Sequence, residues 1–329
     1  MTNLRAGLIG LGMMGRHHAR VLSSLEGVAL VAVADPCGDS HRVAANRPVE
    51  ADIEALIGHG LDYCVVAVPT IFHEEIGLAL AESGVHALIE KPLAHDTPSA
   101  ERVARAFAAR GLIGAVGHIE RYNPALQHAR ARIAAGELGE VHQIATRRQG
   151  PFPARIADVG VMKDLGTHDI DLTTWVTQEE YISVAARTAH RSGREHEDMI
   201  AVVGQLSGGT ITNHLVNWLS PFKERVTIIT GTRGSFIADT LSADLTFHAN
   251  GQIEQAWDAI SKFRGVSEGD VIRYALSKPE PLRIEHEQFR DALLGKEADI
   301  VTMSQGLSTI RVAEACLKSA DTARTISLD

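Results

Sequence analysis

The sequence predicts an α/β protein with two domains, a doubly wound parallel sheet followed by an α+β domain with a largely antiparallel sheet. The chain has 329 residues, which is enough for two domains of roughly 150 residues each. Its first third alternates short apolar runs with helical stretches, whereas the later apolar runs follow one another with turn signals between them. We expect the boundary near residue 120, with domains over 1–120 and 121–329.

The composition is that of an ordinary globular protein. Hydrophobic residues make up 45% and charged residues 22%, which excludes disordered, collagen-like and coiled-coil classes. The 32 basic and 41 acidic residues give a net charge of −9, and no basic stripe is visible, so we expect no nucleic-acid partner. The three cysteines share no CxxC spacing, which indicates a reducing compartment rather than a disulfide framework.

No apolar run reaches the roughly 18 residues that a membrane helix needs. The apolar start from Leu4 to Met14 is interrupted by glycines, so we expect a strand and a turn there rather than a signal peptide. These features predict a cytoplasmic protein that does not bind a membrane.

The elements of the first domain follow from its apolar runs, which are rich in alanine and β-branched residues and do not alternate with polar ones. Such runs are typical of strands buried on both faces of a parallel sheet. The expected strands are 6–9, 29–34, 63–68, 87–89 and 113–116, and the expected helices are 14–25, 73–83 and 98–109. Thr97 before Pro98 predicts an N-cap with proline at the first helical position, and Gly111 predicts the helix end.

The second domain is expected to contain one sheet with helices on one face. The expected helices are 124–135, 168–176 and 304–322, and the expected strands are 141–148, 181–189, 199–206, 210–218, 225–231 and 235–238. Ser207-Gly208-Gly209 is a hairpin turn signal between two of these strands.

The run Gly10-Leu11-Gly12-Met13-Met14-Gly15 matches G-x-G-x-x-G between a predicted strand and a predicted helix. In this context the glycines permit a tight turn, close approach of a pyrophosphate and packing of the helix on the strand. Asp35 ends the next strand, where its carboxylate can accept hydrogen bonds from both ribose hydroxyls. Since a 2′-phosphate would meet a like charge there, the sequence favours NAD over NADP.

Two further strand ends carry polar groups. Pro69 and Thr70, with His73, follow one strand, and Glu90 and Lys91 close another. Ligands of open α/β sheets bind at the carboxyl ends of strands, so both ends are candidate cofactor contacts.

Three motifs together resemble the Gfo/Idh/MocA oxidoreductases over essentially the whole chain. They are the glycine-rich run with His17-His18 after it, Glu90-Lys91-Pro92, and Asp164-Leu165-Gly166-Thr167-His168. The stretches Gly117–Pro124 and Gly150–Pro153, with Arg155, look like those of UDP-N-acetylglucosamine 3-dehydrogenase-type members of that family. The resemblance implies a sugar dehydrogenase with a cis peptide before Pro92.

The resemblance and the motifs together give the candidate site residues. The catalytic candidates are Lys91, Asp164 and His168. The expected NAD contacts are Gly10, Gly12, Met13, Met14, Gly15, Asp35, Pro69, Thr70, His73, Glu90 and Lys91. The expected substrate contacts are Arg121, Asn123, Arg148, Arg155, Asp164 and His168.

Oxidation of an alcohol by NAD needs a base for the hydroxyl proton and a group that stabilises the developing alkoxide. An unperturbed imidazole titrates near 6.5, which suits His168, and Asp164 would share a helix face with it. Lys91 as an ammonium would hydrogen-bond the reacting oxygen. The sequence leaves open which of Lys91 and His168 takes the proton.

The predicted function is therefore NAD-dependent oxidation of a sugar ring hydroxyl, at C3, without a metal. Arg147, Arg148 and Arg155 suit a phosphate, so a nucleotide sugar is the favoured substrate. The alternatives are a sugar of an aminoglycoside or antibiotic pathway, inositol, or a dinucleotide-binding regulator without catalysis. An uncovered apolar face of the second sheet predicts a homodimer or homotetramer.

Overall fold

The computed structural model describes residues 3–153, 159–251 and 268–328, and the chain divides into two compact units. The first holds Met1–Ile119 and Glu280–Glu314, and the second holds Glu120–Pro279 and Ala315–Asp329. The segment Glu280–Glu314, which the sequence analysis assigned to the second domain, thus folds with the first unit.

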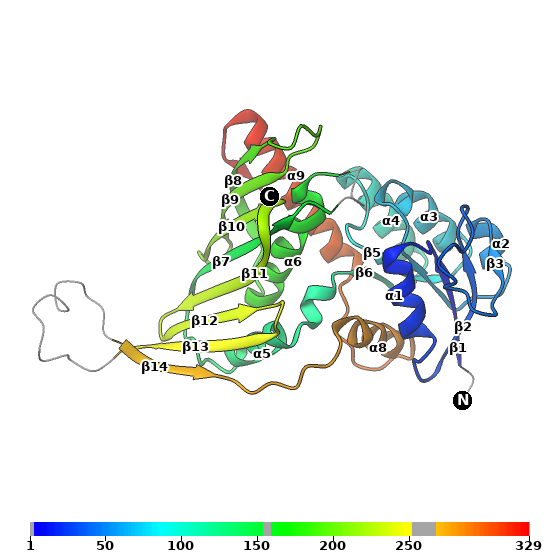
Figure 1. The fold of residues 1–329 in the computed structure, drawn as a ribbon, viewed down its shortest axis with the longest axis horizontal. Coiled ribbons are helices and arrows are strands. Elements are labelled where there is room, and N and C mark those ends of the chain that lie inside the picture. The colour runs from blue at the N-terminus through cyan, green and yellow to red at the C-terminus, as the bar shows by residue number, and fades with distance from the viewer. Residues whose placement is uncertain (1–2, 154–158, 252–267, 329) are drawn as a thin grey trace, which may run out of the picture. The chain divides into compact units, whose positions relative to one another are not determined.

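The first unit is built on a six-stranded sheet in which all neighbouring strands are parallel. The strand order is β3-β2-β1-β4-β5-β6 (Figure 1), which is that of a doubly wound dinucleotide-binding fold. The strands are β1 (Leu4–Ile9), β2 (Val28–Ala34), β3 (Val49–Glu50), β4 (Tyr63–Val66), β5 (His86–Glu90) and β6 (Gly114–Gly117). The helices are α1 (Met13–Leu22), α2 (Ile53–Ile57), η1 (Thr70–Phe72), α3 (His73–Glu82), α4 (Thr97–Ala109), α8 (Pro281–Leu293) and the first part of α9 (Met303–Thr322).

Both faces of this sheet are buried, as the unbroken apolar runs predict. In β4, Tyr63 and Val65 pack into one hydrophobic cluster, while Cys64 and Val66 pack into another. Successive side chains of a strand point to opposite faces, so the two clusters lie on opposite sides of the sheet. Phe289 of α8 stacks edge-on against Tyr63, which places the returning segment against the first of these faces.

The start of α4 corrects the predicted helix cap. Asp96, not Thr97, is the N-cap, and its carboxylate accepts a hydrogen bond from the backbone N–H of Ser99 at 2.8 Å. Thr97 is the first helical residue, and its hydroxyl donates to Glu314 at 2.7 Å. Aspartate and threonine are both favoured N-caps. Because Asp96 and Thr97 are adjacent, the local sequence does not decide which of them caps the helix, and tertiary contacts decide it.

The second unit contains a nine-stranded sheet of order β14-β13-β12-β11-β7-β10-β9-β8-β15 (Figure 1). Its strands are β7 (Val141–Pro151), β8 (Tyr181–Ala189), β9 (Met199–Leu206), β10 (Ile211–Asn217), β11 (Leu219–Gly231), β12 (Gly234–Asp239), β13 (Asp244–Asn250), β14 (Glu268–Arg273) and β15 (Ile326–Ser327). Neighbouring strands are antiparallel except β7 and β10, which are parallel. The largely antiparallel sheet is thus confirmed. The Ser207-Gly208-Gly209 turn connects β9 to β10, and Gly209 has a φ of +95°.

Helices α5 (Pro124–Ala134) and α6 (Thr167–Thr177) cover one face of this sheet. Leu126 of α5 and Leu172 of α6 share a buried cluster with Ile144 of β7. The opposite face carries exposed apolar side chains. Ile144 points toward the helices, so its neighbour Ala145 points to the opposite face. Val203 on β9 is in register with Ala145 through Asn213 on β10, so it lies on that opposite face as well. The exposed apolar residues on that side include Val203, Ile211 and Leu215.

Candidate functional site

The glycine-rich turn between β1 and α1 has the shape of a pyrophosphate-binding turn. Gly10 has a φ of +92°, and a Cβ there would lie 2.4 Å from the carbonyl oxygen of Ala67. A Cβ on Gly15 would lie 1.9 Å from the carbonyl oxygen of Gly10, so only glycine lets α1 begin so close to the turn. A Cβ on Gly12 would meet no atom of the described residues within 4 Å. This side of the turn has room for an anion at the helix N-terminus.

Asp35 follows β2 and contacts the same turn. Its two carboxylate oxygens accept hydrogen bonds from the backbone N–H groups of Leu11 and Cys37, each at 2.8 Å. Each oxygen keeps a further lone pair, so the half-buried carboxylate can still accept from ribose hydroxyls. Met13 and Met14 are the first two residues of α1, and Met13 is exposed. The turn and Asp35 together fit the pyrophosphate and adenosine ribose of NAD.

His73 holds two loops of the first unit together. Its Nδ1 lies 2.9 Å from the carbonyl oxygen of Pro92, and its Nε2 lies 3.0 Å from that of Val68. Burial lowers the pKa of His73, although the carbonyl contacts oppose this. Both ring nitrogens thus face internal carbonyl oxygens, and a contact of His73 with the cofactor stays a prediction. Pro69 is exposed next to it, and Thr70 begins η1.

Glu90 and Lys91 stand at the carboxyl end of β5, and the Lys91–Pro92 peptide is cis, as the family resemblance implied. Glu90 Oε2 accepts the backbone N–H of Lys91 at 3.1 Å, and Oε1 lies 2.9 Å from His18 Nε2. Burial raises the pKa of Glu90, but the hydrogen bond of His18 and the charge of Lys91 outweigh it, so that pKa lies below its usual value. Both oxygens of this carboxylate have internal partners, and a contact of Glu90 with the cofactor stays a prediction.

In the second unit, Asp164 and His168 lie on one continuous helical segment. The segment begins with a π-helical turn, η3 (Met162–Gly166), and continues as α6. Asp164 is 4% exposed and His168 is 8% exposed, so this is not a solvated surface pair. Single π-helical turns are rare and occur frequently at functional sites.

Glu197 fixes the start of this helical segment. Its Oε1 accepts the backbone N–H of Met162 at 2.9 Å, and its carbonyl oxygen accepts the N–H of Val161 at 3.0 Å. A Cβ on Gly160 would overlap the Glu197 carboxylate. The sequence analysis missed Glu197, since nothing in the local pattern shows that a residue from before β9 reaches η3.

Arg121 and Arg148 are buried and paired with carboxylates, whereas the sequence analysis expected them to contact substrate. Arg121 donates to Asp171 through Nε at 2.8 Å and through Nη2 at 2.6 Å. Arg148 donates to Asp169 at 2.8 Å and to Glu120 at 3.0 Å. Both guanidinium groups thus have a carboxylate partner on α6, and contact of either arginine with substrate stays a prediction.

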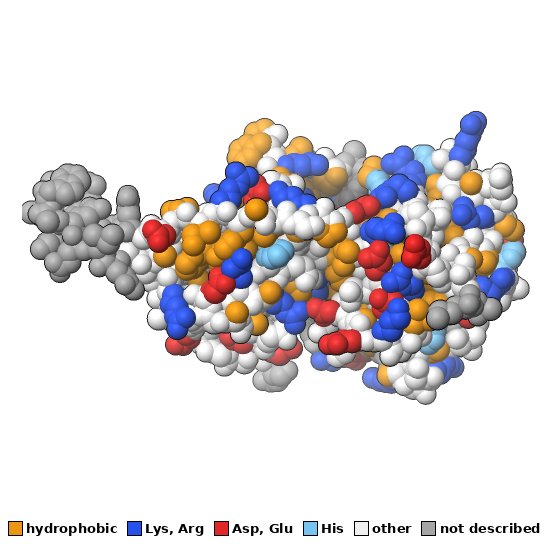
Figure 2. All heavy atoms as spheres, turned by 90° about the horizontal axis from the view of Figure 1, so that it is seen from below, with side chains coloured by type: hydrophobic (Ala, Val, Ile, Leu, Met, Phe, Trp, Pro, Cys, Tyr) orange, Lys and Arg blue, Asp and Glu red, His pale blue; other side chains and the backbone are white. Residues whose placement is uncertain are grey.

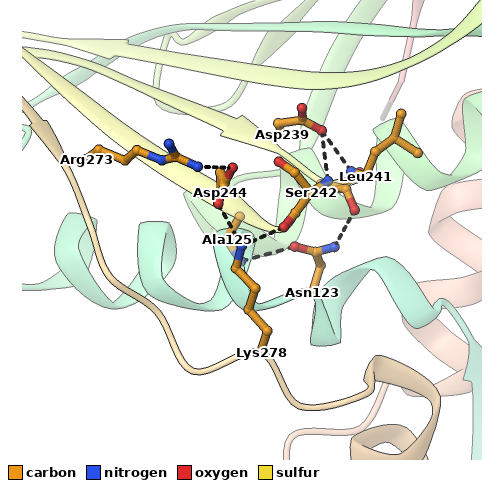
Figure 3. Close-up of polar contacts among 9 residues, drawn as sticks. Asn123, Ala125, Asp239, Leu241, Ser242, Asp244, Arg273 and Lys278 are labelled. Carbon is orange, nitrogen blue, oxygen red and sulfur yellow. Dashed lines mark hydrogen bonds and ion pairs between the residues drawn. The ribbon is translucent and has the colours of Figure 1, made fainter.

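Asn123, a further expected substrate contact, caps α5 (Figure 3). Its Oδ1 accepts the backbone N–H of Ala125 at 3.0 Å, and its Nδ2 donates to the carbonyl oxygen of Thr240 at 2.9 Å. In the neighbouring β12–β13 turn, Asp239 accepts the backbone N–H of Leu241, and Lys278 donates to Asp244 and to the carbonyl oxygen of Ser242. The amide of Asn123 therefore connects a helix start to this turn, which supports a structural role for it.

Substituting Asn123 tests that structural role. Asn123→Ala should lower the free energy of unfolding by about 1–2 kcal/mol, because the N-cap acceptor is lost, and should leave the KM for the sugar unchanged. Asn123→Asp keeps the acceptor and is the matched control in denaturant unfolding. A raised KM with unchanged stability would instead place Asn123 in the substrate site.

The other arginines of this region differ in their environments. Arg155 lies outside the described residues. Arg147 is half exposed and pairs with Glu224 at 3.0 Å. Arg225, which the sequence analysis did not single out, stands directly opposite Arg148 across β11 and β7. Burial, and then the charge of Arg148, lower the pKa of Arg225, and its Nη1 has no hydrogen-bond partner among the described residues.

The surface charge agrees with the composition. On the face shown in Figure 2, basic and acidic side chains are interspersed. Among the described residues, no helix combines the length and the apolar character that crossing a bilayer requires. Over the same part of the chain, no group of three or more His, Cys, Asp or Glu side chains is arranged to hold a metal ion.

Two family models match the chain over nearly its whole length. Residues 4–118 match the NAD-binding Rossmann fold of the GFO/IDH/MocA oxidoreductase family, and residues 130–328 match the C-terminal alpha/beta domain of that family.

Curated relatives are enzymes of sugar and inositol metabolism. A UDP-N-acetylglucosamine 3-dehydrogenase from Acidithiobacillus ferrooxidans is 33% identical over 216 residues, which is 65% of this chain and 66% of that protein. A scyllo-inositol 2-dehydrogenase (NAD(+)) from Bacillus subtilis is 31% identical over 192 residues, or 55% of this chain and 56% of that protein. The chain thus spans less than two thirds of these relatives' length.

Solved structures resemble the chain from end to end. The Acidithiobacillus ferrooxidans UDP-N-acetylglucosamine 3-dehydrogenase has a TM-score of 0.85 at 26% identity, and covers 98% of this chain and 99% of its own. GenD2 of gentamicin A biosynthesis, solved with NAD, has a TM-score of 0.82 at 25% identity over 100% of this chain and 97% of its own.

Proposed function

Because this chain belongs to the GFO/IDH/MocA oxidoreductase family, we propose that it is an NAD-dependent dehydrogenase that oxidises the C3 hydroxyl of a nucleotide sugar to the ketone. Residues 4–118 form its NAD-binding Rossmann domain. The observation that carries the proposal is the burial of Asp164 and His168 on one helical segment that starts with a π-turn. A surface pair with the same spacing would be solvated.

Each candidate residue has a role in the proposed reaction. NAD, when bound, supplies the acceptor for the hydride that leaves the carbinol carbon. His168 takes the hydroxyl proton and Lys91 donates a hydrogen bond to the reacting oxygen, or the two exchange these roles. Asp164 orients the imidazole or accepts a hydrogen bond from a neighbouring sugar hydroxyl.

A charged substituent on the sugar is supported by Arg225. This guanidinium lies beside Arg148 on the neighbouring strand. The charges of Glu120, Asp169 and Asp164 act on Arg225, but Glu120 and Asp169 hydrogen-bond Arg148. An anionic group beside Arg225 would relieve the repulsion between the two arginines. The relative that oxidises a UDP-linked amino sugar supports the same choice of substrate.

Inositol is the second candidate substrate, because several curated relatives are inositol dehydrogenases. A panel separates the two by NADH formation with UDP-N-acetylglucosamine, UDP-glucose, myo-inositol and scyllo-inositol. The proposal expects the highest kcat/KM for a UDP-sugar. A preference for an inositol would overturn the nucleotide-sugar substrate, and no turnover with any member would contradict the dehydrogenase itself.

The carboxylate of Asp35 should decide the choice of cofactor. A 2′-phosphate would sit against this carboxylate, which already accepts two backbone N–H groups, so the Kd for NAD(H) should be lower than that for NADP(H). Asp35→Ser should reduce this preference by about tenfold, or about 1.4 kcal/mol. Titration of both cofactors by intrinsic fluorescence measures the ratio. Tighter binding of NADP(H) to the unaltered protein would remove this role from Asp35.

The open face of the second sheet should form the subunit contact of a homodimer or homotetramer. Val203, Ile211 and Leu215 are exposed there, and apolar side chains gathered on one face are typical of an interface. Light scattering at micromolar concentration should give twice or four times the chain mass. Val203→Glu with Leu215→Glu should shift the mass to that of one chain, whereas Ile71→Glu, on an exposed residue of η1, should not. A monomeric unaltered protein would contradict this assembly.

A further inference from the structure

Two buried imidazoles and the partly buried carboxylate of Glu90, all in the first unit, form a hydrogen-bonded chain that ends at Lys91. His286 Nε2 lies 2.9 Å from His18 Nδ1, and His18 Nε2 lies 2.9 Å from Glu90 Oε1. The other oxygen of Glu90 accepts the backbone N–H of Lys91 at 3.1 Å. His18 comes from α1, directly after the glycine-rich turn, and His286 comes from α8, in the segment that returns to this unit.

The burial of this chain restricts where its protons lie. Burial, and then the proximity of His18, hold the pKa of His286 well below its ordinary value, so this imidazole is neutral. Glu90 is ionised, so His18 Nε2 must carry the proton that it donates. His286 Nδ1 has no hydrogen-bond partner among the described residues. At His286 Nδ1, an unpaired lone pair costs less free energy than an unpaired buried N–H. His286 therefore carries its proton on Nε2 and donates that hydrogen bond to His18 Nδ1.

This arrangement fixes the carboxylate of Glu90 in position and orientation. His18 is fully buried and His286 is 1% exposed, so water does not compete for their hydrogen bonds. On β6, a Cβ added to Gly117 would lie 3.2 Å from the carboxylate carbon of Glu90. The carboxylate is therefore held between β6 and an imidazole whose orientation is set by a second imidazole.

Burying two imidazoles and a carboxylate costs free energy that apolar residues would not cost. Among the described residues, Glu90 faces His18, Lys91 and His73, and His286 faces His18. The adjacent Glu285 of α8 is also buried. The hydrogen bonds thus run from His286 through His18 to Glu90, the residue before Lys91, which indicates that they help to position Lys91.

We propose that His286, His18 and Glu90 are positioning residues that fix the backbone of Lys91 for hydride transfer. The proposal rests on the proposed function, since it takes Lys91 as the residue that contacts the reacting oxygen. His286 sets the tautomer of His18, His18 orients Glu90, and Glu90 holds the N–H of Lys91. The segment Glu280–Glu314 thus contributes to the site through His286 and its hydrogen bond to His18.

The kinetic test compares two substitutions of His286. His286→Leu keeps an apolar side chain of moderate size but removes the donor, and should lower kcat about 10- to 100-fold with the KM for NAD unchanged. His286→Gln can donate from its amide and should recover most of the lost kcat. His17→Ala, on the exposed neighbour of His18, is the matched control and should leave kcat unaltered. Equal kcat for His286→Leu and His286→Gln would overturn the proposal.

Two spectroscopic measurements test the chain without turnover, and so separate its failure from failure of the proposed function. Long-range ¹H–¹⁵N correlation in the unaltered protein should show protons on Nε2 of both His18 and His286. Exchange of the Lys91 amide should become faster in His286→Leu than in His286→Gln. A proton on Nδ1 of His286, or an unchanged exchange rate of the Lys91 amide, would contradict the proposed hydrogen bonds even if His286→Leu folds poorly.

Discussion

Replacement of Lys91 by alanine should lower kcat for sugar oxidation by about 10²–10⁴-fold, the usual contribution of a positioned acid or base. The Kd for NAD should change little, because the groups assigned to the pyrophosphate and ribose are the glycine-rich turn and Asp35, on β1 and β2. Glu90 accepts the backbone N–H of Lys91, and truncation of the Lys91 side chain leaves that hydrogen bond intact. Steady-state kinetics and cofactor titration measure the two quantities separately.

The matched control is Lys296→Ala, on an exposed lysine of the same unit that pairs with Asp291. It should leave both kcat and the Kd for NAD unaltered. Lys91→Arg keeps a positive charge but presents a planar guanidinium, so it should recover only part of the lost rate. Turnover near that of the unaltered enzyme in Lys91→Ala would remove Lys91 from the site.

The sequence predicted best what depends on local pattern. The parallel strands of the first unit are buried on both faces, so their apolar runs are continuous and easily recognised. The glycines of the turn are fixed by contacts within a few residues, such as that between Gly15 and the carbonyl oxygen of Gly10. The antiparallel strands of the second unit were marked by hairpin turns such as the one at Gly209.

Elements fixed by long-range packing were not predicted. β3 and α2 have two and five residues, too few for a periodic pattern. The return of α8 to the first unit depends on contacts such as that between Phe289 and Tyr63, more than 200 residues apart. The parallel pairing of β7 with β10 follows from the order of strands in the sheet, which no turn signal encodes.

In the candidate site, the sequence predicted the residue types but not the partners that each side chain contacts. Sequence alone indicates that an arginine suits an anion, but it does not reveal whether a carboxylate of the same chain already occupies it. Arg148 lies between Asp169 and Glu120, whereas Arg225, opposite it, was indistinguishable from other strand residues. The backbone partners of His73 and Asn123 were likewise not predictable, because polar residues at the ends of helices and strands can contact either a ligand or the backbone.

Replacement of His168 by alanine should also lower kcat by about 10²–10⁴-fold, and it should change the shape of the pH–rate profile. A base acts only when unprotonated, so the rate supported by His168 falls as the pH falls through the pKa of this imidazole. Removal of the imidazole should therefore abolish the acid limb of kcat against pH. Asp164→Asn should cost less in kcat if Asp164 orients the imidazole, and should raise KM if it accepts from a sugar hydroxyl.

Thermal unfolding provides the control for His168, because the side chain is buried within η3–α6 and its loss also leaves a cavity. His168→Gln fills most of that space and keeps a donor at the position of Nε2, but it cannot take a proton. If His168 is the base, His168→Gln should fold as stably as the unaltered protein and remain as inactive as His168→Ala. An acid limb that persists in both variants would assign the proton to Lys91, since the titrating group would then lie elsewhere. Nearly full turnover in both variants would exclude the helical segment from the chemistry.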